Sequence, residues 1–108
     1  MHNMKLKPER RNKEMLILPI KKKWFDMIKS GEKKEEYREI KPYYESRFRG
    51  YYYPKTGMQP YILFRNGHRK DSPTIKCKVV ITRGQGNQEW GAEPNKEYYI
   101  LDILEVYK

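Results

Sequence analysis

The sequence contains a single cysteine, Cys77, among its 108 residues, so no disulfide can form within the chain. Histidine is almost as scarce. With only His2 and His68 available, no clustered zinc-ligand pattern exists, and we expect neither a metal nor a cofactor. No Ser/His/Asp or Cys/His set accompanies His68, which we expect to be an exposed loop residue. Cys77 is expected to be a small core residue.

Long apolar runs are also missing. No segment approaches the length of a transmembrane helix, and the N-terminus lacks the apolar stretch of a signal peptide. The expectation is a reduced, cytoplasmic protein with no membrane contact. The glycines at 84 and 86 do not form a phosphate-binding loop, because their spacing is wrong and no helix pattern follows them. There are no internal repeats and no low-complexity tract.

Positive charge and tyrosine are abundant. The chain carries 24 basic and 14 acidic residues, a formal net charge of +10, and ten tyrosines. Hydrophobic residues make up 37%, so the single expected domain has a small core with much aromatic bulk. The charge favours a polyanionic partner, RNA or a nucleotide, over a role in solubility alone. Residues 1–14 are predicted to be a basic flexible arm that precedes a domain over residues 15–108.

Hydrophobic periodicity predicts one main helix and five strands. The helix spans Lys21–Ser30, with Trp24, Met27 and Ile28 as its apolar stripe and Phe25 at the border. A second, short helical turn starts at Pro42, and residues 49–60 read as a loop with little regular structure. The predicted strands are Met15–Ile20, 34–40, Pro60–Arg65, Thr74–Arg83 and Glu97–Tyr107. This order predicts an α+β, mainly β domain built as a small, partly open barrel.

The most distinctive stretch follows the main helix, which is expected to end at Gly31. Side chains alternate along a strand, so Glu36 and Arg38 should share one face, and Lys33 at the corner could lean over it. Tyr37 points to the opposite face and is assigned a packing role. One interpretation is a polar functional site; the other is an exposed ion pair of little consequence. Because the strand is polar on both faces, it should lie at a sheet edge or line a cleft.

Further cations and aromatics are candidates for nucleic-acid contact. Arginine and lysine interleaved with aromatic rings suit phosphate contact and base stacking, but they suit the packing of a small core equally well. The candidate nucleic-acid-binding residues, the motif included, are Lys21, Lys33, Glu36, Arg38, Tyr43, Arg47, Arg65 and Trp90.

Gly31-x-Lys33-x-x-Glu36-x-Arg38 resembles the main signature of ASCH (activating signal cointegrator homology) domains, which belong to the PUA-like superfamily. The order of the flanking segments is similar too, especially to small bacterial and phage-type members. The similarity covers about residues 15 to 106 and includes Leu16-Pro19-Ile20, Trp24-Phe25-x-x-Ile28, Ile40-Lys41-Pro42-Tyr43, the Tyr-Ile-Leu-Phe strand and Glu89-Trp90-Gly91.

The resemblance implies a PUA-like β-barrel whose cleft beside the first helix binds RNA or modified nucleosides. Some relatives of similar fold are acetylcytidine amidohydrolases or are reported as ribonucleases. In the amidohydrolases the motif's lysine, a threonine and a later glutamate carry the chemistry. Lys33 matches the lysine, the threonine position falls on Glu36, and Glu89 and Glu93 lie near the expected glutamate.

Three classes of function therefore stay open. The first is an RNA- or nucleotide-binding domain. The second is a metal-free hydrolase, in which Glu36 is a general base and Lys33 and Arg38 stabilise developing charge. The third is a protein-interaction adaptor in which the ion pair is only structural.

Overall fold

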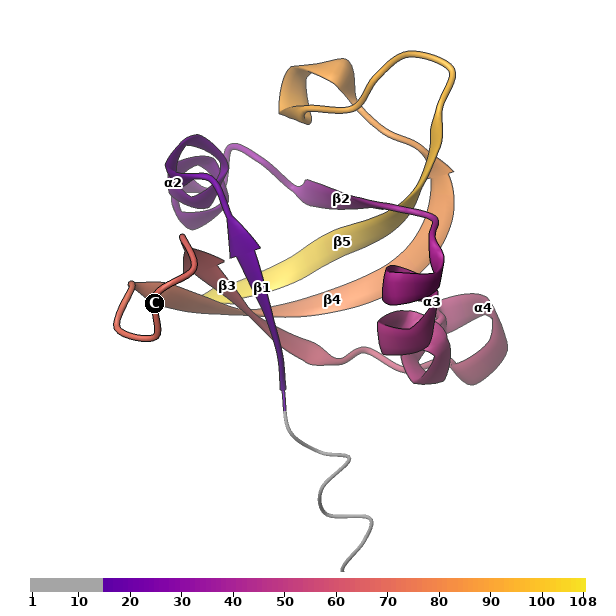
Figure 1. Ribbon diagram of the computed structural model, residues 1–108, viewed down its shortest axis with the longest axis horizontal. Coiled ribbons are helices and arrows are strands. Elements are labelled where there is room, and N and C mark those ends of the chain that lie inside the picture. Colours follow the sequence, from indigo (N-terminus) through magenta and orange to yellow (C-terminus); the bar gives the residue numbers. More distant parts are fainter. Residues whose placement is uncertain (1–14) are drawn as a thin grey trace, which may run out of the picture.

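The computed structural model describes residues 15–108, so the arm predicted for residues 1–14 lies outside the described residues. The chain forms an α+β, mainly β fold in which all five predicted strands are present (Figure 1). The strands are β1 (Leu16–Ile20), β2 (Glu35–Glu39), β3 (Tyr61–Asn66), β4 (Thr74–Gln85) and β5 (Glu97–Tyr107). They form one sheet in the order β1-β3-β4-β5-β2, in which β1 and β3 are parallel and the other pairs antiparallel.

The sheet curls into a half-barrel that brings its two edge strands toward each other (Figure 1). Arg38 on β2 donates a hydrogen bond of 2.9 Å from Nη2 to the backbone carbonyl of Pro19 on β1. A side chain therefore bridges the gap between β1 and β2, where the backbones do not pair. The predicted edge position of β2 is confirmed.

The concave face of the sheet holds the hydrophobic core. Alternate residues of β3 and β4 point inward, and all of them are 5% exposed or less: Ile62, Phe64, Ile75, Cys77, Val79 and Ile81. The expected core position of Cys77 is confirmed. Burial raises the pKa of its thiol to about 12, which keeps the thiol protonated and weakly nucleophilic.

Helix α2 (Lys22–Ser30) packs against this core through Phe25 and Ile28. The predicted stripe is confirmed at Ile28 and at Trp24, which is half-buried and packs against the core. Phe25, predicted at the border, is buried at 5% exposure, whereas Met27 is only partly buried. Gly31 ends the helix as expected: its φ of 88° is left-handed and its N–H donates to the Ile28 carbonyl.

Residues 49–60 are more regular than predicted. Helix α3 (Pro42–Phe48) runs into the 3₁₀ turn η2 (Arg49–Tyr51), and a short helix α4 (Tyr53–Thr56) follows it. A backbone bridge between Tyr52 and Ile81 holds this segment against β4. Strand β4 also extends beyond its predicted end at Arg83, because pairing with β5 continues to Gln85. No helix within residues 15–108 is both long enough and apolar enough to cross a membrane.

Candidate functional site

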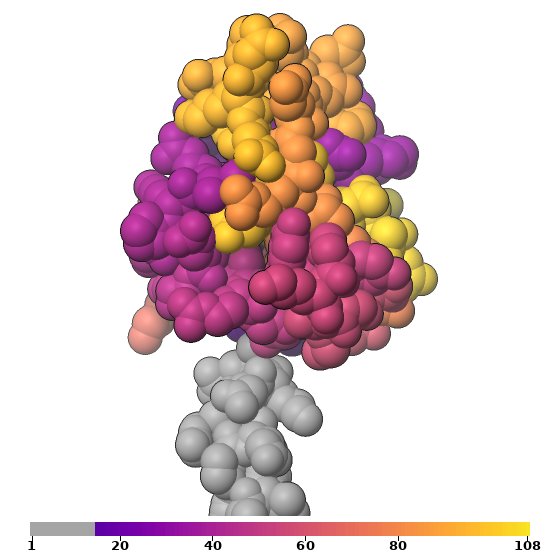
Figure 2. All heavy atoms as spheres, turned by 90° about the vertical axis from the view of Figure 1, so that its right-hand side faces the viewer, coloured from indigo at the N-terminus to yellow at the C-terminus, as the bar shows by residue number. Residues whose placement is uncertain are grey.

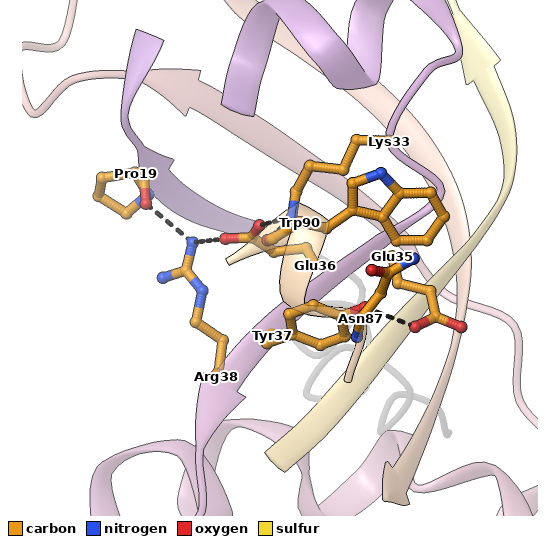
Figure 3. A network of polar contacts seen from close by, with 8 residues as sticks. All are labelled: Pro19, Lys33, Glu35, Glu36, Tyr37, Arg38, Asn87 and Trp90. Atoms are coloured by element: carbon orange, nitrogen blue, oxygen red, sulfur yellow. Dashed lines mark hydrogen bonds and ion pairs between the residues drawn. The ribbon is translucent and has the colours of Figure 1, made fainter. Parts of the chain in front are cut away.

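The three motif side chains meet on the concave face of β2, as the alternation predicted (Figure 3). Glu36 lies between the two cations. Its Oε1 is 3.3 Å from Nζ of Lys33, and its Oε2 is 2.9 Å from Nη2 of Arg38. Both carboxylate oxygens are thus engaged. The cluster carries two positive charges and one negative charge.

Lys33 is among the most buried side chains of the protein, at 1% exposure. Its backbone N–H donates to the Met27 carbonyl, which fixes the corner after α2. Its Nζ donates to the Trp90 carbonyl at 2.6 Å and lies 4.6 Å from the centre of the Trp24 ring. Burial is the main influence on this group and lowers its pKa below the ordinary lysine value, although Glu36 opposes the shift.

Arg38 connects the cluster to the helical side of the molecule. Its Nη1 donates to the Tyr44 hydroxyl at 3.0 Å, while its Nε is buried without an acceptor. The Tyr44 ring stacks on Phe48 at 5.6 Å, and Phe48 meets Tyr99 edge-on at 5.2 Å. A continuous row of contacts therefore runs from Arg38 to Tyr99.

Tyr37 lies on the other face of β2, as predicted, but it does more than pack. Its hydroxyl donates to Glu35 at 2.7 Å and accepts the backbone N–H of Asn87 at 2.8 Å (Figure 3). A Cβ on Gly86 would lie 2.6 Å from Cζ of Tyr37. The segment after β4 is therefore held closely against this ring. It leads into the 3₁₀ turn η3 (Gln88–Trp90), whose Trp90 carbonyl covers Lys33.

The burial of this cluster agrees with neither interpretation of the sequence. The side chains of Lys33, Glu36 and Arg38 are 1%, 8% and 11% exposed, so they do not form an exposed ion pair. Nor do they present much surface to a ligand. The arrangement is a buried ionic network that joins β1, β2 and the segment before β5.

A hollow of about 340 Å³ lies at the other end of the row of contacts that starts at Arg38. Phe48 and Tyr99 form its buried floor, and Tyr52 forms part of its wall. Three exposed cations, Arg49, Lys55 and Arg83, share the remaining lining with one carboxylate, Glu45. Figure 2 faces this side of the molecule, where α3 and the α4 segment flank the end of β4.

The electrostatics of this hollow favour an anion. Arg83 has a partner in Glu97, but the contact is long, at 3.7 Å, and both side chains are exposed. The Arg83 guanidinium also lies 5.7 Å from the centre of the Tyr99 ring. Burial, followed by the Glu45 carboxylate, raises the pKa of the Tyr99 hydroxyl, so this floor residue stays neutral near pH 7.

A second hollow, of about 290 Å³, lies beside the start of α2. Lys21 lines it, as do Lys22, Asn66 and His68. Pro19 on β1, whose carbonyl accepts the hydrogen bond from Arg38, also lies in the lining. Lys21 is exposed, and its contact with nucleic acid stays a prediction. His68 is exposed, as expected.

The remaining candidates are scattered. Tyr43 and Arg47 pair on the outside of α3, with the guanidinium 4.0 Å from the ring centre. Arg65 lies on the convex face of β3, opposite Thr74. Glu89 and Glu93 are exposed, and in the described residues the carboxylate paired with Lys33 belongs to Glu36.

Sequence reasoning missed three cations and one aromatic ring of the larger hollow, namely Arg49, Lys55, Arg83 and Tyr99. They come from η2, α4, β4 and β5. Strand pairing brings Arg83 beside Tyr99, and the bridge between Tyr52 and Ile81 holds the segment with Arg49 and Lys55 against β4. The period-2 pattern of β5 could have indicated that Tyr99 faces inward with Leu101.

No group of three or more histidine, cysteine, aspartate or glutamate side chains within residues 15–108 is placed to hold a metal ion. Comparison of the chain with protein-family models, curated proteins and solved structures finds no match.

Proposed function

We propose that this protein binds RNA or a nucleotide, and that the hollow between α3, α4, β4 and β5 is the contact site. The observation that supports this is the combination of three exposed cations with an aromatic floor in a space of about 340 Å³. That volume is in the usual range for small-ligand sites. Arg49, Lys55 and Arg83 suit phosphate groups, while the exposed part of Tyr52 offers a ring for a base.

In this proposal the motif residues position the site. Arg38 holds Tyr44, Tyr44 stacks on Phe48, and Phe48 supports Tyr99 in the floor. The resemblance of Gly31-x-Lys33-x-x-Glu36-x-Arg38 to the ASCH signature points to the same class of ligand, since it implies a PUA-like domain that binds RNA or modified nucleosides. Replacing Arg38 should therefore weaken binding without removing a direct contact.

The test is binding of a fluorescent single-stranded RNA across a salt series. Arg49→Gln/Lys55→Gln removes two cations of the hollow. Lys29→Gln/Lys34→Gln is the matched control, because it removes the same charge from exposed positions at the end of α2 and the corner after it. If both hollow cations contact phosphates, the slope of log affinity against log salt should fall by roughly 1.4 in the first variant only.

An equal decrease of the salt slope in the control pair would mean that binding depends on the net charge of the protein and not on a defined site, which would contradict the proposal. Absence of any RNA binding would exclude RNA as the ligand. The same variants would then be tested for binding of nucleotides and modified nucleosides. Arg38→Ala, checked for folding by circular dichroism, should weaken binding while the salt slope stays close to that of the wild type.

Hydrolysis is the second candidate function, and one observation favours it. A lysine whose pKa is lowered by burial, beside a carboxylate, is a common feature of catalytic sites. The 1% exposure of Lys33 opposes this, because a substrate could reach Nζ only if the segment carrying Trp90 moved. Running the RNA on a gel after each binding experiment separates the two functions: cleavage that is lost in Lys33→Met would support a ribonuclease.

A further inference from the structure

The convex face of the sheet carries a second surface with aromatic and basic character. Tyr61 on β3 and Tyr107 at the end of β5 are 41% and 37% exposed, and their ring centres lie 5.8 Å apart. Strand register places Tyr61 opposite Lys78 and Tyr107 opposite Lys76. Directly paired residues share a face, so these four side chains, the Lys–Tyr platform, lie together on three adjacent strands.

The lysines of this platform are held over the rings and not by carboxylates. Lys76 Nζ lies 4.7 Å from the centre of the Tyr61 ring and 5.2 Å from that of Tyr107, and Lys78 Nζ lies 5.8 Å from that of Tyr61. Among the described residues neither lysine forms an ion pair. Glu105 lies directly opposite Lys78 on β5, shares this face, and accepts a hydrogen bond from the Tyr107 hydroxyl. The surface therefore combines two lysines with one carboxylate and keeps a net positive charge.

Aliphatic side chains extend the platform. Leu63 lies opposite Lys76, and Ile17, which is 43% exposed, lies opposite Leu63. Arg65 is two residues beyond Leu63 on the same face of β3 and adds a third cation. An uncovered sheet face with two tyrosine rings, apolar neighbours and more cations than carboxylates suits the faces of unstacked bases joined by phosphates.

We infer that the Lys–Tyr platform binds single-stranded nucleic acid, with bases against Tyr61 and Tyr107 and phosphates near Lys76 and Lys78. A duplex fits poorly, because its bases are already stacked on each other. The inference does not rest on the hollow. Lys78 and Arg83 are five residues apart on β4, roughly 17 Å along the strand, and their side chains point to opposite faces.

The test uses the full chain and three labelled probes: an oligouridylate of about 12 nucleotides, a base-free ribose-phosphate oligomer of the same length, and an RNA duplex. Tyr61→Ala/Tyr107→Ala should weaken oligouridylate binding about tenfold by removing stacking, and leave the base-free oligomer unaffected. Tyr61→Phe/Tyr107→Phe keeps both rings and should stay within about twofold of the wild type.

The lysines provide an independent readout if loss of both rings impairs folding. Lys76→Gln/Lys78→Gln should reduce the salt slope by roughly 1.4 for both single-stranded probes, whereas Lys29→Gln/Lys34→Gln should not. Tighter binding of the duplex than of the oligouridylate, or wild-type affinity in both the alanine and the glutamine pairs, would overturn the inference. So would self-association of the chain through this face, detected by light scattering and abolished by the alanine pair.

Failure of this inference can be told apart from failure of the proposed function. Loss of binding only in the Arg49→Gln/Lys55→Gln variant would retain the hollow and reject the platform. Loss of binding only in the platform variants would retain the platform and reject the hollow.

Discussion

Glu36 is the residue on which the buried network depends. It is the carboxylate between Lys33 and Arg38, so its removal leaves two buried cations facing each other without a counterion. Removal of Lys33 is different, because Glu36 keeps Arg38 and the cost of burying an ammonium group disappears. The two substitutions should therefore differ in their cost.

We predict that Glu36→Gln lowers the free energy of unfolding by about 3 kcal/mol, as expected when one partner of a buried pair is removed. Lys33→Met, which keeps the length and apolar stem of the side chain, should cost about 1 kcal/mol for the lost hydrogen bond to Trp90. Urea unfolding near pH 7 measures both. A larger loss for Lys33→Met than for Glu36→Gln would show that the ammonium, and not the carboxylate, is the stabilising member.

The lowered pKa of Lys33 also predicts a dependence on pH. Between the folded-state pKa and the ordinary value of 10.5, the unfolded chain holds a proton at this site that the folded chain has released. Stability rises with pH wherever the unfolded state binds more protons. Wild type should therefore gain stability relative to Lys33→Met as the pH rises toward 10.5.

The difference between the two proteins is the quantity to measure, by urea unfolding over a pH series. Deprotonation of Cys77 and of the tyrosines on unfolding acts on both proteins and largely cancels. A difference that shrinks in the alkaline range would mean that folding raises the pKa of Lys33 instead.

At the scale of secondary structure, the sequence predicted the elements and the meeting of the motif residues, because both follow from local periodicity. It did not predict their burial. Trp24 and Trp90, which lie against Lys33, are 66 residues apart, and nothing local brings the second to the first. The error over residues 49–60 has a different cause: Pro54 and Gly57 are typical of a loop, yet Pro54 lies in the first turn of α4 and Gly57 caps its C-terminal end.

The contact between Arg38 and Pro19 predicts an effect on one strand. Arg38 uses Nη1 for Tyr44 and Nη2 for Pro19 and Glu36, whereas lysine carries all its donors on one nitrogen and cannot reproduce this two-nitrogen geometry. Arg38→Lys should destabilise the protein by about 1–2 kcal/mol. Protection of the β1 amides against hydrogen exchange should fall more than that of β4, because β1 is otherwise held on one side only, by β3.

Amide hydrogen exchange followed by NMR measures this difference. Arg69→Lys is the control, since the Arg69 side chain is 82% exposed and makes no contact with the sheet edge in the described structure. An equal loss of protection in β1 and β4 would show that Arg38 contributes only to global stability.

For the whole molecule, the positive charge was evident from composition, but its division between two surfaces was not. The pairing register of β3, β4 and β5 assembles the Lys–Tyr platform, and packing of the α3–α4 segment on β4 and β5 completes the hollow; a single sequence reveals neither. In Figure 1 the helices that border the hollow lie at the right, and the C-terminal end of β5 lies at the left. The two surfaces occupy different ends and opposite faces of one sheet.

This separation predicts additive effects on binding. An oligonucleotide of about 4 nucleotides can occupy one surface at a time, so we expect variants of the hollow and of the platform to affect separate binding events. For a strand long enough to reach both, the free-energy losses of Arg49→Gln/Lys55→Gln and Tyr61→Ala/Tyr107→Ala should add within about 0.5 kcal/mol, as expected for distant sites. Fluorescence anisotropy with the two pairs and their combination measures this. A combined loss well below the sum would mean that both sets of residues act on a single contact region.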